Sequence, residues 1–121
     1  FFFIEFTYDK NRPKSIFFEK AKVFPLEESI EYASGGVISK QITKSPAGNV
    51  TLFSFDEGQG LTEHTASYDA MVQILDGEAE ILIDETPHLV KKGECIIMPA
   101  GIPHALHAVR PFKMLLTMIK G

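Results

Sequence analysis

The stretch GQGLTEHTASYDAMVQILDG, from Gly58 to Gly77, decides the fold that we predict for this chain. Its first glycine is followed after five residues by His64, and it ends in an Asp-Gly turn. A second stretch, GECIIMPAGIPH from Gly93 to His104, again leads from a glycine to a histidine, this time through a Pro-x-Gly turn. Two histidines carried on neighbouring strands predict one shared pocket.

Short runs with strand periodicity, separated by Gly and Pro, surround these two stretches. The runs that we expect to be strands cover residues 37–43, 50–55, 68–75, 78–84, 88–90, 95–98, 104–109 and 112–119. The dipeptide Asp76-Gly77 between two such runs predicts a two-residue hairpin. Many short strands at close spacing are typical of an all-β sandwich or barrel. A chain of 121 residues suffices for one core, so we expect a single domain.

Residues 1–36 precede the strand pattern and form a predicted N-terminal arm and lead-in segment. The opening FFFIEF indicates a short edge strand or an arm that docks on a partner subunit. The polar DKNRPK at 9–14 is typical of a loop, and PLEE at 25–28 resembles the start of a short helix. We therefore expect the barrel domain to cover residues 37–121.

The composition excludes several classes of protein. The net charge is −4 and the basic residues are scattered, which argues against nucleic-acid binding. No apolar run approaches the length needed to span a membrane, and FFFIEF lacks the basic leader of a signal peptide. The single cysteine, Cys95, cannot form an intrachain disulfide, which fits a reducing compartment such as the cytoplasm. Cys95 lies in an apolar run, so we expect a buried, inert thiol.

The two histidine stretches resemble the motifs of the cupin family, whose fold is a double-stranded β-helix of the jelly-roll type, as in RmlC-like barrels. The first cupin motif is G-x5-H-x-H-x3/4-E-x6-G. This chain has His64 at the first histidine, but Ala66 stands where the second histidine belongs and Ala70 where the glutamate belongs. With alanine at these two positions, the motif resembles that of a subgroup of single-domain bacterial cupins that have His-Thr-Ala in place of His-x-His.

The second cupin motif is G-x5-P-x-G-x2-H-x3-N. Here Gly93, Pro99, Gly101 and His104 match at the right spacing, and Ala108 replaces the asparagine. The resemblance covers residues 37–119 and implies the cupin fold for that part of the chain.

Metal binding is the next property that the resemblance bears on. Metal-binding cupins usually hold Fe, Mn, Zn, Ni or Cu through the motif histidines and glutamate, so the resemblance implies only His64 and His104 as metal ligands. The candidates for a third ligand are Tyr68 and, if a bulge turns one of them inward, Glu63 or Asp69. Without a metal, the two imidazoles are either neutral groups hydrogen-bonded inside a pocket or direct contacts for an anionic or polar ligand.

Strand alternation predicts the lining of the pocket. If residues 64–72 are extended throughout, every second side chain from His64 to Val72 shares the inner face with those of the strand that begins at His104. The expected lining is His64, Ala66, Tyr68, Ala70, Val72, Met98, His104 and Leu106. An apolar wall with a few polar points is typical of a small-molecule site.

Three functions agree with these residues. The first, which we favour, is a cupin that binds a small molecule. The second is a metal-dependent dioxygenase, isomerase or decarboxylase with a reduced two-histidine site. The third is a metal-free enzyme with a histidine acid or base, like sugar-nucleotide epimerase cupins, although the motifs carry no basic cluster to hold a phosphate. The apolar FFFIEF arm and exposed edge strands also predict a homodimer.

Overall fold

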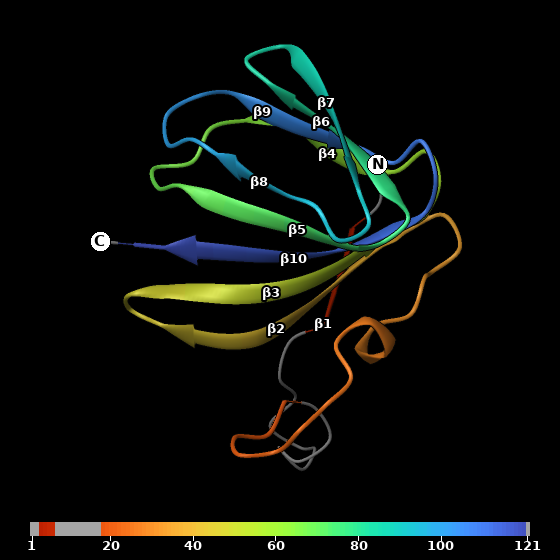
Figure 1. The fold of residues 1–121 in the computed structure, drawn as a ribbon, viewed down its shortest axis with the longest axis vertical. Coiled ribbons are helices and arrows are strands. Elements are labelled where there is room, and N and C mark those ends of the chain that lie inside the picture. Colours follow the sequence, from red (N-terminus) through yellow and green to blue (C-terminus); the bar gives the residue numbers. More distant parts are fainter. Residues whose placement is uncertain (1–2, 7–17, 121) are drawn as a thin grey trace.

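The computed structural model describes residues 3–6 and 18–120. The ten strands in this part of the chain form two sheets that face each other (Figure 1). The strands are β1 (Phe3–Phe6), β2 (Val37–Ser45), β3 (Gly48–Phe55), β4 (Gly60–His64), β5 (Ala70–Asp76), β6 (Glu78–Ile83), β7 (Thr86–Lys91), β8 (Cys95–Met98), β9 (His104–His107) and β10 (Phe112–Ile119).

One sheet has six strands in the order β1-β2-β3-β10-β5-β8, and the other has four in the order β4-β9-β6-β7. All neighbours are antiparallel except β1, which pairs with β2 in parallel. The predicted all-β jelly-roll fold is confirmed, and the predicted N-terminal arm lies mostly outside the described residues. No helix in the described part of the chain is long and apolar enough to cross a membrane.

The expected hairpin at Asp76-Gly77 is wrong. The strand before it, β5, pairs with β10 and β8, whereas β6 after it pairs with β9 and β7. Gly77 therefore carries the chain from one sheet to the other, with φ +71°. A Cβ atom on Gly77 would lie 2.1 Å from the carbonyl oxygen of Pro111, so this crossing requires glycine.

A two-residue hairpin does occur one strand later. It joins β6 to β7 through Asp84 and Glu85, with Ile83 paired to Thr86. The φ angles of Asp84 and Glu85 are +50° and +68°, and positive values at both positions are typical of the type I′ turn.

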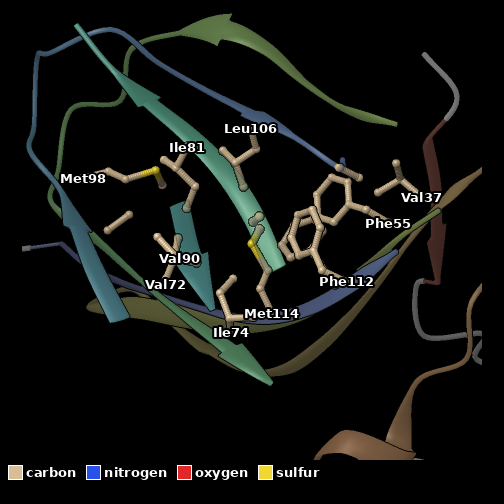
Figure 2. Close-up of a cluster of buried hydrophobic side chains, with 14 residues drawn as sticks. Val37, Phe55, Val72, Ile74, Ile81, Val90, Met98, Leu106, Phe112 and Met114 are labelled. Atoms are coloured by element: carbon tan, nitrogen blue, oxygen red, sulfur yellow. The ribbon is translucent and has the colours of Figure 1, made fainter. Parts of the chain in front are cut away.

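The core lies between the inner faces of the two sheets (Figure 2). Its buried members are Val37, Phe53, Phe55, Ala70, Val72, Ile74, Ala79, Ile81, Val90, Met98, Leu106, Ala108, Phe112 and Met114. Phe55 stacks on Phe112 with ring centroids 4.5 Å apart and on Phe53 at 5.9 Å. Figure 2 shows Phe55 and Phe112 on one side of the core and Met98 on the other.

Residues 18–36 (orange in Figure 1) pack in part on the outer face of the six-stranded sheet, through Phe18, Leu26, Ile30 and Ala33. Ile30 is buried there against Ile38 and Leu52. The expected short helix is a single 3-10 turn, Glu27–Ser29. The boundary between a lead-in segment and a barrel domain at residue 37 stays a prediction, and the predicted loop at 9–14 lies outside the described residues.

The expected burial of Cys95 is wrong. Cys95 is exposed, because β8 is an edge strand and alternate residues of its apolar run face outward. Met98 is buried and Ile96 half-buried on the inner side of the same strand, while Ile97 is exposed.

Candidate functional site

His64 and His104 lie side by side at one end of the barrel. They are the last residue of β4 and the first residue of β9, and they are paired directly across the two strands. Their ring centroids are 4.4 Å apart, with an angle of 67° between the ring planes. His104 is 3% exposed, whereas His64 lies at the surface.

A β-bulge in β4 places His64 on the same side as His104. Leu61 pairs with Leu106 and His64 with His104, so three steps on β4 oppose two on β9. The extra residue reverses the strand alternation, and bulges commonly redirect a side chain in this way next to functional sites. Glu63, within the bulge, stays exposed.

Backbone carbonyls fix the protonation pattern of both imidazoles. The Nδ1 atom of His64 is 2.8 Å from the carbonyl oxygen of Thr62, and that of His104 is 3.2 Å from the carbonyl oxygen of Ile102. A carbonyl oxygen only accepts hydrogen bonds, so Nδ1 must donate in each ring. In the neutral imidazole, Nε2 then carries a lone pair and no proton.

The Nε2 atom of His104 is not fully buried. In the described part of the chain, no fully buried side-chain nitrogen or oxygen lacks a hydrogen-bond partner. His104 is a buried residue whose only protein hydrogen bond uses Nδ1, so its Nε2 must reach accessible space. Burial lowers the pKa of His104, opposed by the hydrogen bond to Ile102 and aided by the nearby His64, so this ring is neutral at pH 7.

The segment between His64 and Ala70 departs from the expected single strand. The strand ends at His64 and resumes at Ala70, because β4 belongs to the four-stranded sheet and β5 to the six-stranded sheet. Ala66 and Tyr68 therefore lie in a connecting loop, and Tyr68 is 40% exposed. The loop is held to the Pro99–Gly101 turn by two 2.8 Å hydrogen bonds, from Gly101 N to Ala66 O and from Ala100 N to Asp69 Oδ1.

The remaining residues of the expected lining are buried in the barrel core. Ala70, Val72, Met98 and Leu106 all belong to the inner cluster. Ala70 is directly paired with Met98 on one side.

Met118 continues this wall, and so does Asn49, which the sequence interpretation did not single out. Ala70 is paired with Met118 on its other side, and Met118 is paired with Asn49. Directly paired residues share a face, so Asn49, Met118, Ala70 and Met98 form one row across four strands. The sequence does contain a signal for Asn49. Thr51, Phe53 and Phe55 share one face by strand alternation, and Asn49, two residues before Thr51, belongs to the same face.

The metal site expected at His64 and His104 stays a prediction. Nowhere among them do three His, Cys, Asp or Glu side chains gather closely enough to hold an ion. Of the expected third ligands, Asp69 already accepts a backbone hydrogen bond and Glu63 is exposed. Catalytic zinc sites normally have three protein ligands, so two imidazoles alone fall short of that shell.

Comparison with known proteins gives one consistent result. The sequence profile described as Cupin domain matches residues 51–119. The crystal structure of a conserved protein of unknown function from Streptococcus pyogenes is 43% identical, with TM-score 0.80, covering 85% of this chain and 90% of that one. A cupin 2 conserved barrel domain protein from Leptotrichia buccalis is 44% identical, with TM-score 0.78, covering 80% of this chain but 47% of that one.

A cupin superfamily protein from Desulfitobacterium hafniense is 28% identical, with TM-score 0.79, covering 85% of this chain and 94% of that one. No curated protein matches this chain.

Proposed function

This chain belongs to the cupin domain family, and from that premise we propose that it binds a small molecule at the end of the barrel where His64 and His104 meet. One observation carries the proposal: the buried His104 keeps an open Nε2 atom beside a second imidazole. A barrel that needed only packing at this point would place an apolar side chain there. A few polar points in an apolar wall are typical of ligand sites.

The proposed site has a polar side and an apolar side. The two imidazoles are the polar side, and the row through Ala70 and Met98 is the apolar side. We propose that the ligand contacts residues from His64, Ala66, Tyr68, Ala70, Val72, Met98, His104 and Leu106. We also propose that the chain belongs to the His-Thr-Ala subgroup of cupins, on the strength of Ala66 and Ala70 in the first motif.

A fragment screen on isotope-labelled protein tests the proposal. Binding fragments are expected to shift the NMR signals of His64, Ala70 and Met98 and to leave those of Phe112 unchanged. The variant His104→Leu should lose fragment binding while its thermal unfolding remains cooperative. His107→Leu is the matched control, because His107 lies on the same strand with its side chain exposed. Equal binding by both variants would contradict the proposal.

A metal-dependent enzyme with a two-histidine site is the second candidate. The observation in its favour is that two imidazoles lie 4.4 Å apart with their Nδ1 atoms held by carbonyls, as is common for metal-ligating histidines. Against it stands the lack of a third His, Cys, Asp or Glu ligand in the described part of the chain.

Elemental analysis of untagged protein, purified without added metal, separates the two candidates. A transition metal near one atom per chain, lost in His104→Leu, would favour the enzyme. Metal far below one per chain, with none regained after adding Fe, Mn, Ni, Cu or Zn, would favour the ligand-binding barrel.

We further propose that the chain forms a homodimer to which the N-terminal strand contributes. Two observations support a pairing surface: β1 and β8 are the edges of the six-stranded sheet, and β8 has Ile97 exposed on its outer side. Light scattering at micromolar concentration, with and without residues 1–6, tests the assembly. A monomeric full-length protein would contradict it.

A further inference from the structure

We infer that the ligand of this site is a hydrogen-bond donor, a small molecule whose O–H or N–H groups point at the Nε2 atoms of His64 and His104. The inference rests on the proposed function and adds the chemical class of the ligand. It follows from the carbonyl contacts of the two rings, which leave both of them as acceptors.

The first step is the direction of each hydrogen bond. The carbonyl oxygens of Thr62 and Ile102 take the Nδ1 protons of His64 and His104. A neutral imidazole has one proton to donate, and in both rings it is already committed. In the neutral form of each ring, Nε2 therefore cannot donate and presents a lone pair.

The second step is that both carbonyls belong to the backbone beside their own histidine. Each acceptor is two residues before the ring that it holds. The bulge before His64 and the turn before His104 thus set the tautomer as well as the position of the side chain. Rotating either ring to free Nδ1 would sacrifice a hydrogen bond, so the acceptor character belongs to the site before any ligand arrives.

The third step is that one molecule can reach both acceptors. The ring centroids are 4.4 Å apart, a distance that a small molecule can span, and the ring planes are inclined at 67°. An amine, or two hydroxyl groups on adjacent carbons, presents donors with that spread. A carboxylate or a ketone presents only lone pairs, which the two Nε2 atoms repel.

The surroundings reinforce this selection. Asp69 and Glu63 are the acidic groups nearest in sequence to the pair, and Asp69 accepts a backbone hydrogen bond in the loop beside the site. Alternating strand geometry puts apolar Ala70 and Met98 on the inner wall. An apolar molecule with one or two donor groups, such as a phenol or an amine, matches both sides of the site.

The tautomer is measured directly by long-range proton–nitrogen NMR on uniformly labelled protein at pH 8, above the ordinary pKa of histidine, about 6.5. We expect unprotonated Nε2 and protonated Nδ1 in both His64 and His104. The exposed His107 is the internal reference, because its Nδ1 lies 4.0 Å from a carboxylate oxygen of Glu80 and not against the carbonyl two residues before it. A protonated Nε2 in either His64 or His104 would overturn the inference.

Ligand selection is measured with three probes of similar size: phenol, which donates, anisole, which does not, and acetophenone, which only accepts. We expect phenol to bind about tenfold more tightly than the other two, as a hydrogen bond of about 1.4 kcal/mol implies. In His104→Gln, whose side-chain amide can rotate to donate or accept, the preference should shrink. Anisole or acetophenone binding as tightly as phenol, or an unchanged preference in His104→Gln, would overturn the inference.

A different result would contradict the proposed function itself. If none of the three probes binds at millimolar concentration and none shifts the signals of Ala70 or Met98, the binding pocket itself is contradicted, and the inference falls with it. If all three bind equally, the pocket stands and only the donor selection is overturned.

Discussion

The aromatic group at the end of the barrel opposite the histidines is expected to carry a large part of the stability. Phe112 is fully buried and stacks on Phe55 at 4.5 Å. Truncation of such a residue to alanine removes its apolar contacts and leaves a cavity, which destabilises by about 3–5 kcal/mol. We expect Phe112→Ala near the upper end of that range, because the stacking with Phe55 is lost as well.

That loss is large against the total free energy of unfolding, which is about 5–15 kcal/mol for a domain. Urea unfolding followed by circular dichroism gives the measurement. With a urea slope of about 2 kcal/mol per molar, the midpoint should fall by about 2 M. Phe112→Leu keeps an apolar side chain and loses mainly the aromatic contact, so it should cost about 1 kcal/mol and remain folded.

The control is Val109→Ala, three residues away, where the side chain is 51% exposed and the cost should stay within about 0.5 kcal/mol. Phe112 and Met118 are at opposite ends of β10, roughly 20 Å apart along the strand. Phe112→Leu should therefore bind phenol as the unmodified protein does. A Phe112→Ala variant no less stable than Val109→Ala would refute the assignment of this stack to the core.

Three further predictions follow from single positions. Gly77→Ala should destabilise the protein clearly more than Gly58→Ala in urea unfolding. Both glycines have positive φ, but of the two only Gly77 has a backbone oxygen where a Cβ would lie. Equal losses of stability would contradict the close contact at Gly77. Cys95 should react with a thiol reagent in the folded protein at a rate near that of the urea-unfolded chain, and strong protection would mean that its exposure is wrong. Burial lowers the folded-state pKa of His104, so as the pH falls the unfolded chain takes up the proton first. The contribution of His104 to stability is therefore complete above about pH 6.5 and is lost as the pH falls towards the folded-state pKa. Comparing urea midpoints at pH 8 and pH 5, His104→Gln should lose less stability than the unmodified protein, and an equal loss in the two proteins would contradict the lowered pKa of His104.

The sequence was sufficient for the fold because turn residues and strand alternation agree over most of the barrel. The strands at 95–98 and 112–119 have the bounds that were predicted, each limited by a neighbouring proline or glycine. The hairpin at Asp76-Gly77 was wrong for a physical reason. A sharp turn indicates that the chain changes direction, but which sheet each flanking strand joins depends on partners far away in the sequence.

The candidate site was only partly accessible from the sequence. Motif spacing and alternation singled out His64 and His104, which the structure brings together. The same alternation placed Ala66 and Tyr68 on a strand, whereas they lie in a loop, because it assumed one continuous strand where the chain crosses between sheets. The carbonyl partners of the two rings depend on the bulge and the turn, neither of which a side-chain pattern reveals.

Ala70 connects the packing of the barrel to the chemistry of its open end. It stands where the resemblance places a metal-binding glutamate, and it is 2% exposed, with Met98 and Met118 as its direct neighbours across the sheet. Methionine side chains are flexible and fill irregular space, so two of them beside an alanine can occupy the volume that a longer residue would need. A carboxylate at this position would be surrounded by apolar atoms, which is unfavourable unless a cation neutralises it. The apolar neighbours of Ala70 and the absence of a ligand at position 70 are thus two aspects of one arrangement, and both favour a site whose polar groups are the two imidazoles, with Asn49 at the far end of the row.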